Sequence, residues 1–287
     1  MISGLCGGFL WALDTVILSV VLAPFSMSFA APLAATAFHD LGSALWLAVL
    51  TTLRRRWPAV LRAVKHRDGR RIMTAALLGG PVGMAGYVMA IRYLGPGLAA
   101  SVSSLYPALG LLAGALMFHE PVTRRQITGM ILSLGCLMLL SGGAVQGSGF
   151  WPGLGFGLLA ATGWACEGLL VQKADSVDND VALLLRQSVS GTVFWLAVLP
   201  LFHGFGDAQA MSGSLGLLAA ASLAGTASYL CYYLAIHRLG AARAMPLNIT
   251  FCAWAPVLAW LFQGTPVTLW QAMLCAGVIL GGMLCAL

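Results

Sequence analysis

The chain has 287 residues, of which 60% are hydrophobic and 8% are charged. A soluble domain usually carries about 25% charged residues, so this composition excludes a water-soluble globule, and its hydrophobicity excludes an intrinsically disordered chain. The net charge of +6 does not indicate nucleic-acid binding, because the basic residues are concentrated in a loop between apolar segments. We therefore predict an all-α polytopic membrane protein.

Ten segments are apolar and long enough to cross a bilayer core about 30 Å thick, which needs roughly 20 residues per helix. The first contains Asp14 and lacks a preceding basic region, so we expect a retained transmembrane helix and not a cleaved signal. The fifth is the shortest. The ten expected helices are Gly4–Leu22, Ala30–Leu53, Ile72–Ile91, Gly97–Phe118, Ile127–Leu140, Gly153–Val171, Val181–Phe202, Leu215–Ile236, Ala241–Phe262 and Val267–Leu287.

The basic residues indicate one orientation in the membrane. Eight of the 15 lie between Arg54 and Arg71, and six more fall on or near the same side if the ten helices alternate, with Arg92 as the exception. Because cytoplasmic loops are enriched in Lys and Arg, we expect this side and both termini to face the cytoplasm. Within the loop, Trp57–Lys65 has the spacing of a short amphipathic helix on the membrane surface.

Four short motifs recur in the same order in the two halves of the chain. Each half, residues 1–145 and 150–287, holds five expected helices. Because five is odd, the second half enters the membrane from the opposite side, which predicts two inverted-topology five-helix repeats and a basis for alternating access. The recurring pairs are Trp11–Asp14 with Trp164–Glu167, Trp46–Leu50 with Trp195–Leu199, Tyr87–Gly95 with Tyr232–Gly240, and Pro121–Gln126 with Pro266–Gln271.

A few ionisable residues lie inside the expected helices, where each costs at least ~2.5–3.5 kcal/mol to insert. Asp14 and Glu167 occupy equivalent positions in the two repeats, and each follows a tryptophan, Trp11 or Trp164, by three residues. Side chains three residues apart share a helix face, and an indole face beside a carboxylate suits an organic cation. Arg186 is a candidate for a structural ion pair with one of the acids.

Further aromatic residues extend this candidate substrate site. Tyr106 lies in the fourth expected helix, Tyr229 and Tyr233 share one side of the eighth, and Trp254 lies in the ninth. Asn248, before Trp254, is placed to hydrogen-bond either a substrate hydroxyl or the backbone. Each aromatic residue taken alone is equally compatible with packing or lipid contact, but together they favour an aromatic cage for a cation.

The sequence shows no pattern for metal binding or catalysis. The seven cysteines lie in apolar runs without a CxxC pair, which indicates buried hydrophobic residues and not ligands or disulfides. GxSxG, HExxH and the phosphate-binding GxxxxGK[ST] pattern are all missing from the sequence. We therefore predict no cofactor, no metal and no enzymatic activity.

The repeat, the ten expected helices and the stretch from Tyr93 through Pro107 to Glu120 resemble the drug/metabolite transporter superfamily, EamA type, over essentially the whole chain. Within this superfamily the sequence is similar to the bacterial choline transporters of the lic locus. The residues that carry the closer resemblance are His39-Asp40, Gly80–Met84, Ser101–Pro107, Trp164–Glu167, Leu185–Gln187 and Tyr229–Ile236.

The resemblance implies a proton-coupled importer in the bacterial inner membrane whose aromatic pocket holds a quaternary ammonium. Glu167 would be the countercharge, with Trp164, Tyr106 and Tyr233 in the cage. Most superfamily members move other solutes, many of them outward, so membership alone fixes neither substrate nor direction.

We therefore expect a secondary active transporter that imports choline or a related small cation by alternating access. Asp14, Asp40, His39 and Glu167 are the candidates for the coupled proton. The expected partners are the cationic substrate, protons and the lipid bilayer, with no nucleic acid, and the protein is expected to be a monomer or a homodimer.

Two alternatives remain open from the sequence. An exporter of amino acids or other small metabolites would use the same fold, and Arg186 would then bind the substrate carboxylate. A non-transporting membrane scaffold would have no central cavity and would not be stabilised by small ligands.

Overall fold

The computed structural model describes residues 1–119, 121–142 and 149–287, and every regular element within these ranges is helical. The fold class expected from the composition is therefore confirmed. Glu120 and most of the expected boundary between the halves, residues 145–150, lie outside the described residues.

The first half of the chain makes five passes: α1, α2, α4 continued by α5, α6 continued by α7, and α8. The short α3 lies between the second and third passes, and a π-helical segment, Leu78–Val82, joins α4 to α5. The helices are α1 (Ile2–Leu22), α2 (Ala31–Leu53), α3 (Trp57–Lys65), α4 (Arg67–Leu77), α5 (Gly83–Leu94), α6 (Pro96–Ser103), α7 (Tyr106–Phe118) and α8 (Arg124–Leu140).

The second half repeats this plan with α9, α10 continued by α11, α13, α14 continued by α15, and α16. The short α12 lies between the second and third passes, and a π-helical segment, Phe194–Val198, joins α10 to α11. The helices are α9 (Phe150–Gln172), α10 (Asn179–Val193), α11 (Leu199–Leu201), α12 (Phe205–Met211), α13 (Leu215–Leu239), α14 (Ala241–Asn248), α15 (Phe251–Gln263) and α16 (Leu269–Ala286).

Nine of these passes, in the part of the chain that the structure describes, are long and apolar enough to cross a bilayer. The remaining pass, α8, has 17 residues, which at 1.5 Å per residue span about 26 Å. It begins three residues before the expected Ile127, because Thr123 caps the helix and forms a reciprocal capping box with Gln126.

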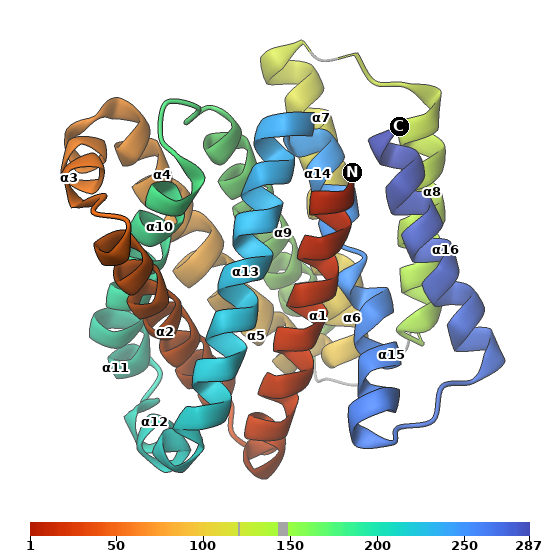
Figure 1. The fold of residues 1–287 in the computed structure, drawn as a ribbon. Coiled ribbons are helices and arrows are strands. Elements are labelled where there is room, and N and C mark those ends of the chain that lie inside the picture. The colour runs from red at the N-terminus through yellow and green to blue at the C-terminus, as the bar shows by residue number, and fades with distance from the viewer. Residues whose placement is uncertain (120, 143–148) are drawn as a thin grey trace.

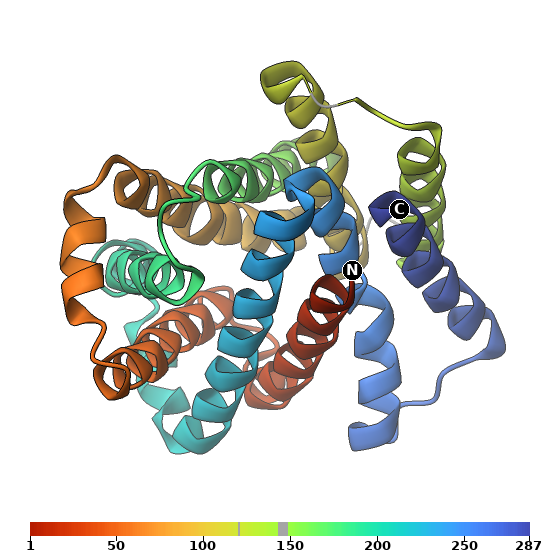
Figure 2. The same cartoon turned by 45° about the horizontal axis from the view of Figure 1, so that its top comes forward.

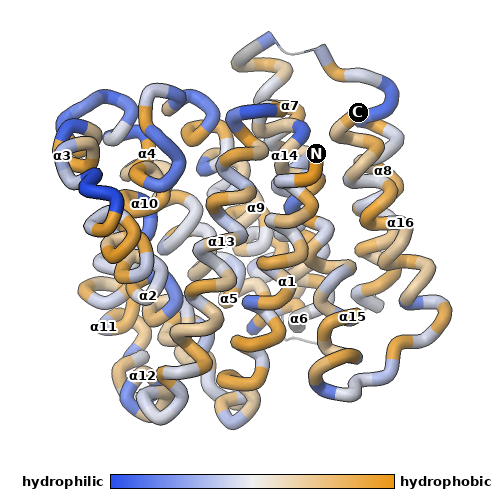
Figure 3. Tube along the Cα trace, in the orientation of Figure 1, coloured by the Kyte–Doolittle hydropathy of each residue, from blue (hydrophilic) through white to orange (hydrophobic). Residues whose placement is uncertain are grey.

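The two halves run in opposite directions. Figure 1 shows α1 running from the end of the molecule that carries both termini towards the opposite end, whereas α9, which opens the second half, runs the other way. The basic helix α3 lies at the same end as the termini, and the hydrophilic residues gather there (Figure 3). This arrangement agrees with the expected common side of the basic loop and the two termini.

Backbone conformation repeats with the 145-residue displacement of two of the sequence motifs, Tyr87–Gly95 and Pro121–Gln126. Gly95 and Gly240 adopt φ values of 80° and 83° where a pass ends and the chain turns directly into the next. Residues with side chains rarely adopt such φ values. The capping box at Thr123 also recurs, at Thr268. The internal repeat is therefore present in the local geometry as well as in the sequence.

Two passes expected as continuous helices are interrupted near the centre of the molecule. α6 ends at Ser103 and α7 begins at Tyr106, while α14 ends at Asn248 and α15 begins at Phe251. The two interruptions are related by the repeat. Pro107 in the first turn of α7 explains the first one, because proline cannot donate the hydrogen bond that would continue the preceding helix. The second has Cys252 at the equivalent position, so no proline marks this interruption in the sequence.

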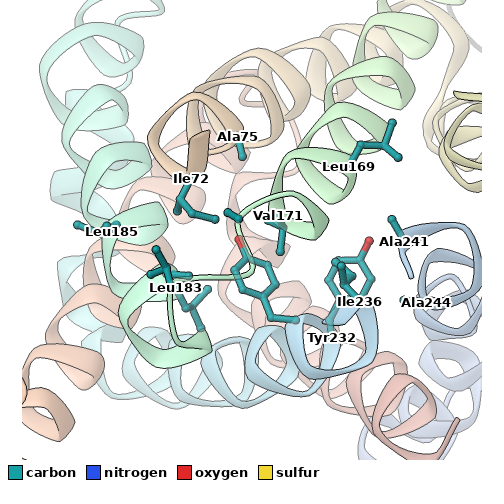
Figure 4. Close-up of a cluster of buried hydrophobic side chains, with 14 of the residues drawn as sticks. Ile72, Ala75, Leu169, Val171, Leu183, Leu185, Tyr232, Ile236, Ala241 and Ala244 are labelled. Carbon is teal, nitrogen blue, oxygen red and sulfur yellow. The ribbon is translucent and has the colours of Figure 1, made fainter. Parts of the chain in front are cut away.

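Buried apolar side chains close the end of the molecule that carries the basic loop. Figure 4 shows this cluster, which draws on the ends of α4, α9, α10, α13 and α14 that lie towards the termini. Ile72, Leu183 and Ile236 in it are almost completely buried. Away from this core, α8 and α16 pack on each other at one edge of the molecule (Figure 2).

Candidate functional site

A central cavity of about 380 Å³ lies between the two halves, within the size range of about 300–1,000 Å³ typical of small-molecule sites. It reaches Leu22 at the end of α1, Pro32 at the start of α2 and Ile91 near the end of α5. These ends lie opposite the termini (Figure 1). Because the buried cluster of Figure 4 closes the other end, the cavity extends towards the side away from the basic loop.

Arg186 on α10 is the centre of a buried ion-pair network beside this cavity. Its Nε donates to Glu167 Oε1 at 2.9 Å, and Nη1 donates to Asp40 Oδ2 at 3.2 Å and to Gln187 Oε1 at 2.6 Å. Nη2 donates to the Tyr229 hydroxyl at 2.9 Å. All three guanidinium nitrogens therefore have partners, and the ion pair expected with one acid is formed with two.

His39 on α2 connects this network to Asp14 on α1. Its Nδ1 lies 3.1 Å from Asp40 Oδ1, and its Nε2 lies 3.5 Å from Asp14 Oδ2. Asp14 Oδ1 and His39 Nε2 have no hydrogen-bond partner among the described residues, although both side chains line the cavity and are almost completely buried. Unpartnered buried polar atoms are rare in native proteins, so this pair is placed to receive a proton or a ligand donor.

Aromatic rings from both halves form the cavity wall, and two pairs are related by the repeat. Trp11 and Trp164 are equivalent, as are Phe251 and Tyr106, and all four line the cavity. Trp11 meets Phe251 edge to face with ring centroids 6.5 Å apart, and Trp164 meets Tyr106 in the same way at 5.9 Å. The cavity thus has a tryptophan-centred aromatic group on each side.

The π-helical segment Leu78–Val82 makes room for the charged network. A Cβ at Gly79 would overlap the Glu167 carboxylate, and a Cβ at Gly80 would overlap the Ser190 hydroxyl. The Gly79 carbonyl also accepts the indole N–H of Trp164 at 3.0 Å. This segment therefore holds the carboxylate and the indole of the same helix in place.

The charges in the cavity do not balance. Counted with every acid ionised, the described lining residues include three carboxylates, Asp14, Asp40 and Glu167, and one guanidinium, Arg186, which leaves a formal charge of two negative units if His39 is neutral and one if it is protonated. An unbalanced charge inside a membrane is unfavourable, so the cavity favours cations. No group of His, Cys, Asp and Glu side chains within the described residues is arranged to hold a metal ion.

Comparison with protein-family models identifies the kind of protein. The model described as the EamA-like transporter family matches residues 1–142 and again residues 151–287. The chain belongs to the EamA-like transporter family. This membership indicates a multi-pass membrane protein that transports small molecules, and it agrees with the superfamily to which the sequence was assigned by resemblance. The resemblance to the choline-transporter subgroup stays a prediction.

A solved structure described simply as the crystal structure of a protein is similar to this EamA-like chain in fold. Its TM-score is 0.71, and the alignment covers 98% of this chain and 96% of that chain at 18% sequence identity. At this identity the likeness concerns the fold alone. The curated proteins contain no match to the chain.

Most residues singled out from the sequence meet in the cavity. Asn248 donates its side-chain amide to the Tyr106 hydroxyl at 3.2 Å, so these two residues form one polar unit at the wall. The predicted residues that line the cavity are Trp11, Asp14, His39, Asp40, Tyr106, Trp164, Glu167, Arg186, Tyr229 and Asn248.

Two residues expected to bind substrate do not line the cavity. Trp254 packs edge to face on Phe9 of α1, with centroids 5.7 Å apart, so its ring fills the contact between α1 and α15. Tyr233 is fully buried behind Glu167, with its hydroxyl 3.5 Å from Oε1. The expectation of direct substrate contact is therefore corrected for both: Trp254 packs between helices, and Tyr233 supports the carboxylate.

The sequence interpretation missed some lining residues that the repeat would have revealed. Phe251 is the equivalent of Tyr106, and Tyr87 is the equivalent of Tyr232, each displaced by 145 residues, and all four line the cavity. Applying the repeat displacement to each candidate would have found them. The sequence indicated Gly79 more weakly as a site residue, through its position directly before the Gly80–Met84 motif.

Proposed function

We propose that this EamA-like transporter imports choline or a related small quaternary or organic cation by alternating access, coupled to protons. The observation that carries the proposal is the excess of buried carboxylates over guanidinium groups in a cavity with aromatic walls. When His39 is neutral and every acid is ionised, the cavity lacks two positive charges to balance its carboxylates. One substrate cation and one proton carried together would supply both.

The substrate cation is assigned to the neighbourhood of Glu167. Its Oε1 is shared between Arg186 and Tyr233, whereas Oε2 accepts no hydrogen bond from the described residues. Trp164 and Tyr106 lie on the same side of the cavity, and their ring faces attract a cation that has few or no N–H donors.

The coupled proton is assigned to the pair of Asp14 and His39. Among the described lining residues, Asp14 Oδ1 and His39 Nε2 are buried without a hydrogen-bond partner, and the two side chains are linked to the substrate region through Asp40 and Arg186. A proton that binds here neutralises one of the negative charges that also attract the substrate cation. The substrate cation and the proton together would therefore balance the charge of the cavity, which favours the doubly loaded protein inside the membrane.

The geometry favours this proposal over the export of amino acids. A zwitterion needs a donor for its carboxylate, and Arg186 already donates to Glu167, Asp40, Gln187 and Tyr229. A non-transporting scaffold is disfavoured by the family membership and by the cavity itself.

We place the protein in the bacterial inner membrane with the basic loop and both termini in the cytoplasm, because the basic helix α3 lies at the same end as the termini (Figure 1). The cavity would then extend towards the outside, as expected for an importer ready to receive substrate. A monomer or a homodimer is compatible with this arrangement.

Thermal unfolding of the purified protein with choline, betaine and neutral amino acids tests the substrate class. We expect choline to raise the midpoint most, since a ligand at a hundredfold its Kd stabilises by about 2.7 kcal/mol. Trp164→Leu should remove this shift, whereas Trp254→Leu, a matched change outside the cavity, should keep it. Greater stabilisation by an amino acid or betaine than by choline would reject the proposed substrate.

A further inference from the structure

The short helix α3 presents an apolar ridge and a cationic flank on the outside of the molecule. Trp57, Leu61 and Val64, spaced by four and three residues, are 43%, 64% and 42% exposed. The neighbouring side of α3 is buried, with Val60 and Ala63 packed against the protein. A large part of each ridge side chain is therefore left uncovered by the chain, although the indole N–H of Trp57 donates to Thr52 Oγ1 at 3.0 Å.

The position of α3 places this ridge at the membrane surface. α2 ends at Leu53 and α4 begins at Arg67, so α3 connects two membrane passes at the level where both leave the bilayer. Figure 1 shows α3 at the outer edge of the molecule, near the end that carries the termini. A ridge at this level would meet the boundary between acyl chains and headgroups.

The basic residues around α3 differ in their partners. Arg56 hydrogen-bonds to Asp178 and holds both oxygens of Asp180 at 2.8 Å, and Arg71 pairs with Asp68 at 2.6 Å. The Arg56 contacts attach the loop to the start of α10, whereas the Arg71 pair lies within α4. The basic residues left exposed without an acidic partner among the described residues are Arg55, Arg62, Lys65, Arg67 and Arg70.

We propose that α3 and its flanking arginines bind the headgroups of anionic phospholipids in the bilayer that surrounds the protein. The five unpaired cations supply charge complementarity, and the ridge of Trp57, Leu61 and Val64 supplies the apolar contact that a soluble anion would not need. Trp57 has the amphipathic ring favoured at membrane interfaces.

This lipid site has a direct structural connection to the cavity. Arg56 fixes the start of α3 to Asp178 and Asp180 at the beginning of α10, and α10 carries Arg186. Anionic lipid bound at α3 therefore stabilises the position of α10. Lipid binding at α3 does not depend on which substrate the cavity takes.

The test compares unfolding midpoints of the full-length protein in neutral mixed micelles with added phosphatidylglycerol or phosphatidylcholine. We expect phosphatidylglycerol to raise the midpoint and phosphatidylcholine to leave it unchanged. Replacing Arg55, Arg62, Lys65 and Arg67 by Gln should weaken phosphatidylglycerol binding roughly fivefold per residue. Salt at about 1 M should also reduce the shift, because it screens exposed charges.

The matched control replaces four other exposed arginines by Gln, and it should keep the phosphatidylglycerol shift. An equal loss in both variants would show a general effect of net charge and overturn the site. Equal shifts with both lipids would also overturn it. Inorganic polyphosphate, added as a soluble polyanion, should give no comparable shift, and an equal shift would reject lipid as the partner. The control positions are Arg124, Arg125, Arg238 and Arg243.

Discussion

At the scale of single residues, the contacts of Arg186 distinguish the acids that it pairs with from the acid that it does not contact. It neutralises part of the charge on Glu167 and Asp40 and leaves Asp14 to His39 alone. The sequence placed these residues inside the membrane, but it gave no means of deciding which acid would pair with the arginine. The structure separates a substrate region at Glu167 from a second charged pair at Asp14.

Glu167→Gln should weaken choline binding by about 2 kcal/mol or more, roughly thirtyfold, because it removes the countercharge and leaves Arg186 with one carboxylate partner. Binding of labelled choline to purified protein measures this. Asp175→Asn, in an exposed residue between α9 and α10, is the control and should bind normally. Normal affinity in Glu167→Gln would refute the countercharge role.

Asp14→Asn should separate binding from coupling. The substitution removes the carboxylate that faces His39 Nε2 and does not touch Arg186. We expect the affinity for choline to stay within about threefold, a change of less than 1 kcal/mol, while a pH gradient no longer drives accumulation. Both are measured on the same proteoliposomes. Unchanged proton-driven accumulation would place the proton elsewhere.

At the scale of elements, the irregular backbone segments around the cavity contribute more to the shape of the substrate site than the regular helices do. The π-helical segment Leu78–Val82 and the interruptions at Ser103–Tyr106 and Asn248–Phe251 all lie at the cavity. Backbone that departs from helical geometry within a membrane is tolerated where it lines a cavity or is buried in protein. The fold thus places its irregular backbone where substrate would bind.

Gly79→Ala should disturb the substrate site through this segment. The new methyl group would overlap the Glu167 carboxylate, and overpacking of this kind typically costs about 1–3 kcal/mol. We expect the KM for choline to rise while the protein still folds, as judged by size-exclusion chromatography. Gly155→Ala is the control, because a Cβ at Gly155 meets nothing within 4 Å; equal KM values in both variants would contradict a positioning role.

At the scale of the whole molecule, the sequence predicted the architecture well because hydrophobic length, basic-residue placement and an internal repeat are long-range patterns. The repeat appears again in the backbone at Gly95 and Gly240. The sequence did not predict that Trp254 packs on α1, because helical spacing alone does not say which face of α15 turns to α1. Such choices depend on packing between helices from different halves.

The proposed orientation predicts the location of both termini. A C-terminal fusion to green fluorescent protein should fluoresce, because this reporter folds in the cytoplasm, and a C-terminal fusion to alkaline phosphatase should be inactive. The same reporters fused after α12, at the opposite end of the molecule (Figure 1), should give the reverse pattern. Active phosphatase at the C-terminus would show that the basic loop faces outward.

We propose that the acidic, aromatic cavity between the two inverted repeats carries a small organic cation together with a proton. Uptake of labelled choline into proteoliposomes under an imposed pH gradient tests it most directly. We expect accumulation that is driven by a proton gradient directed inward and is lost when an ionophore dissipates that gradient. No uptake of choline, or uptake at the same rate with and without the gradient, would contradict it.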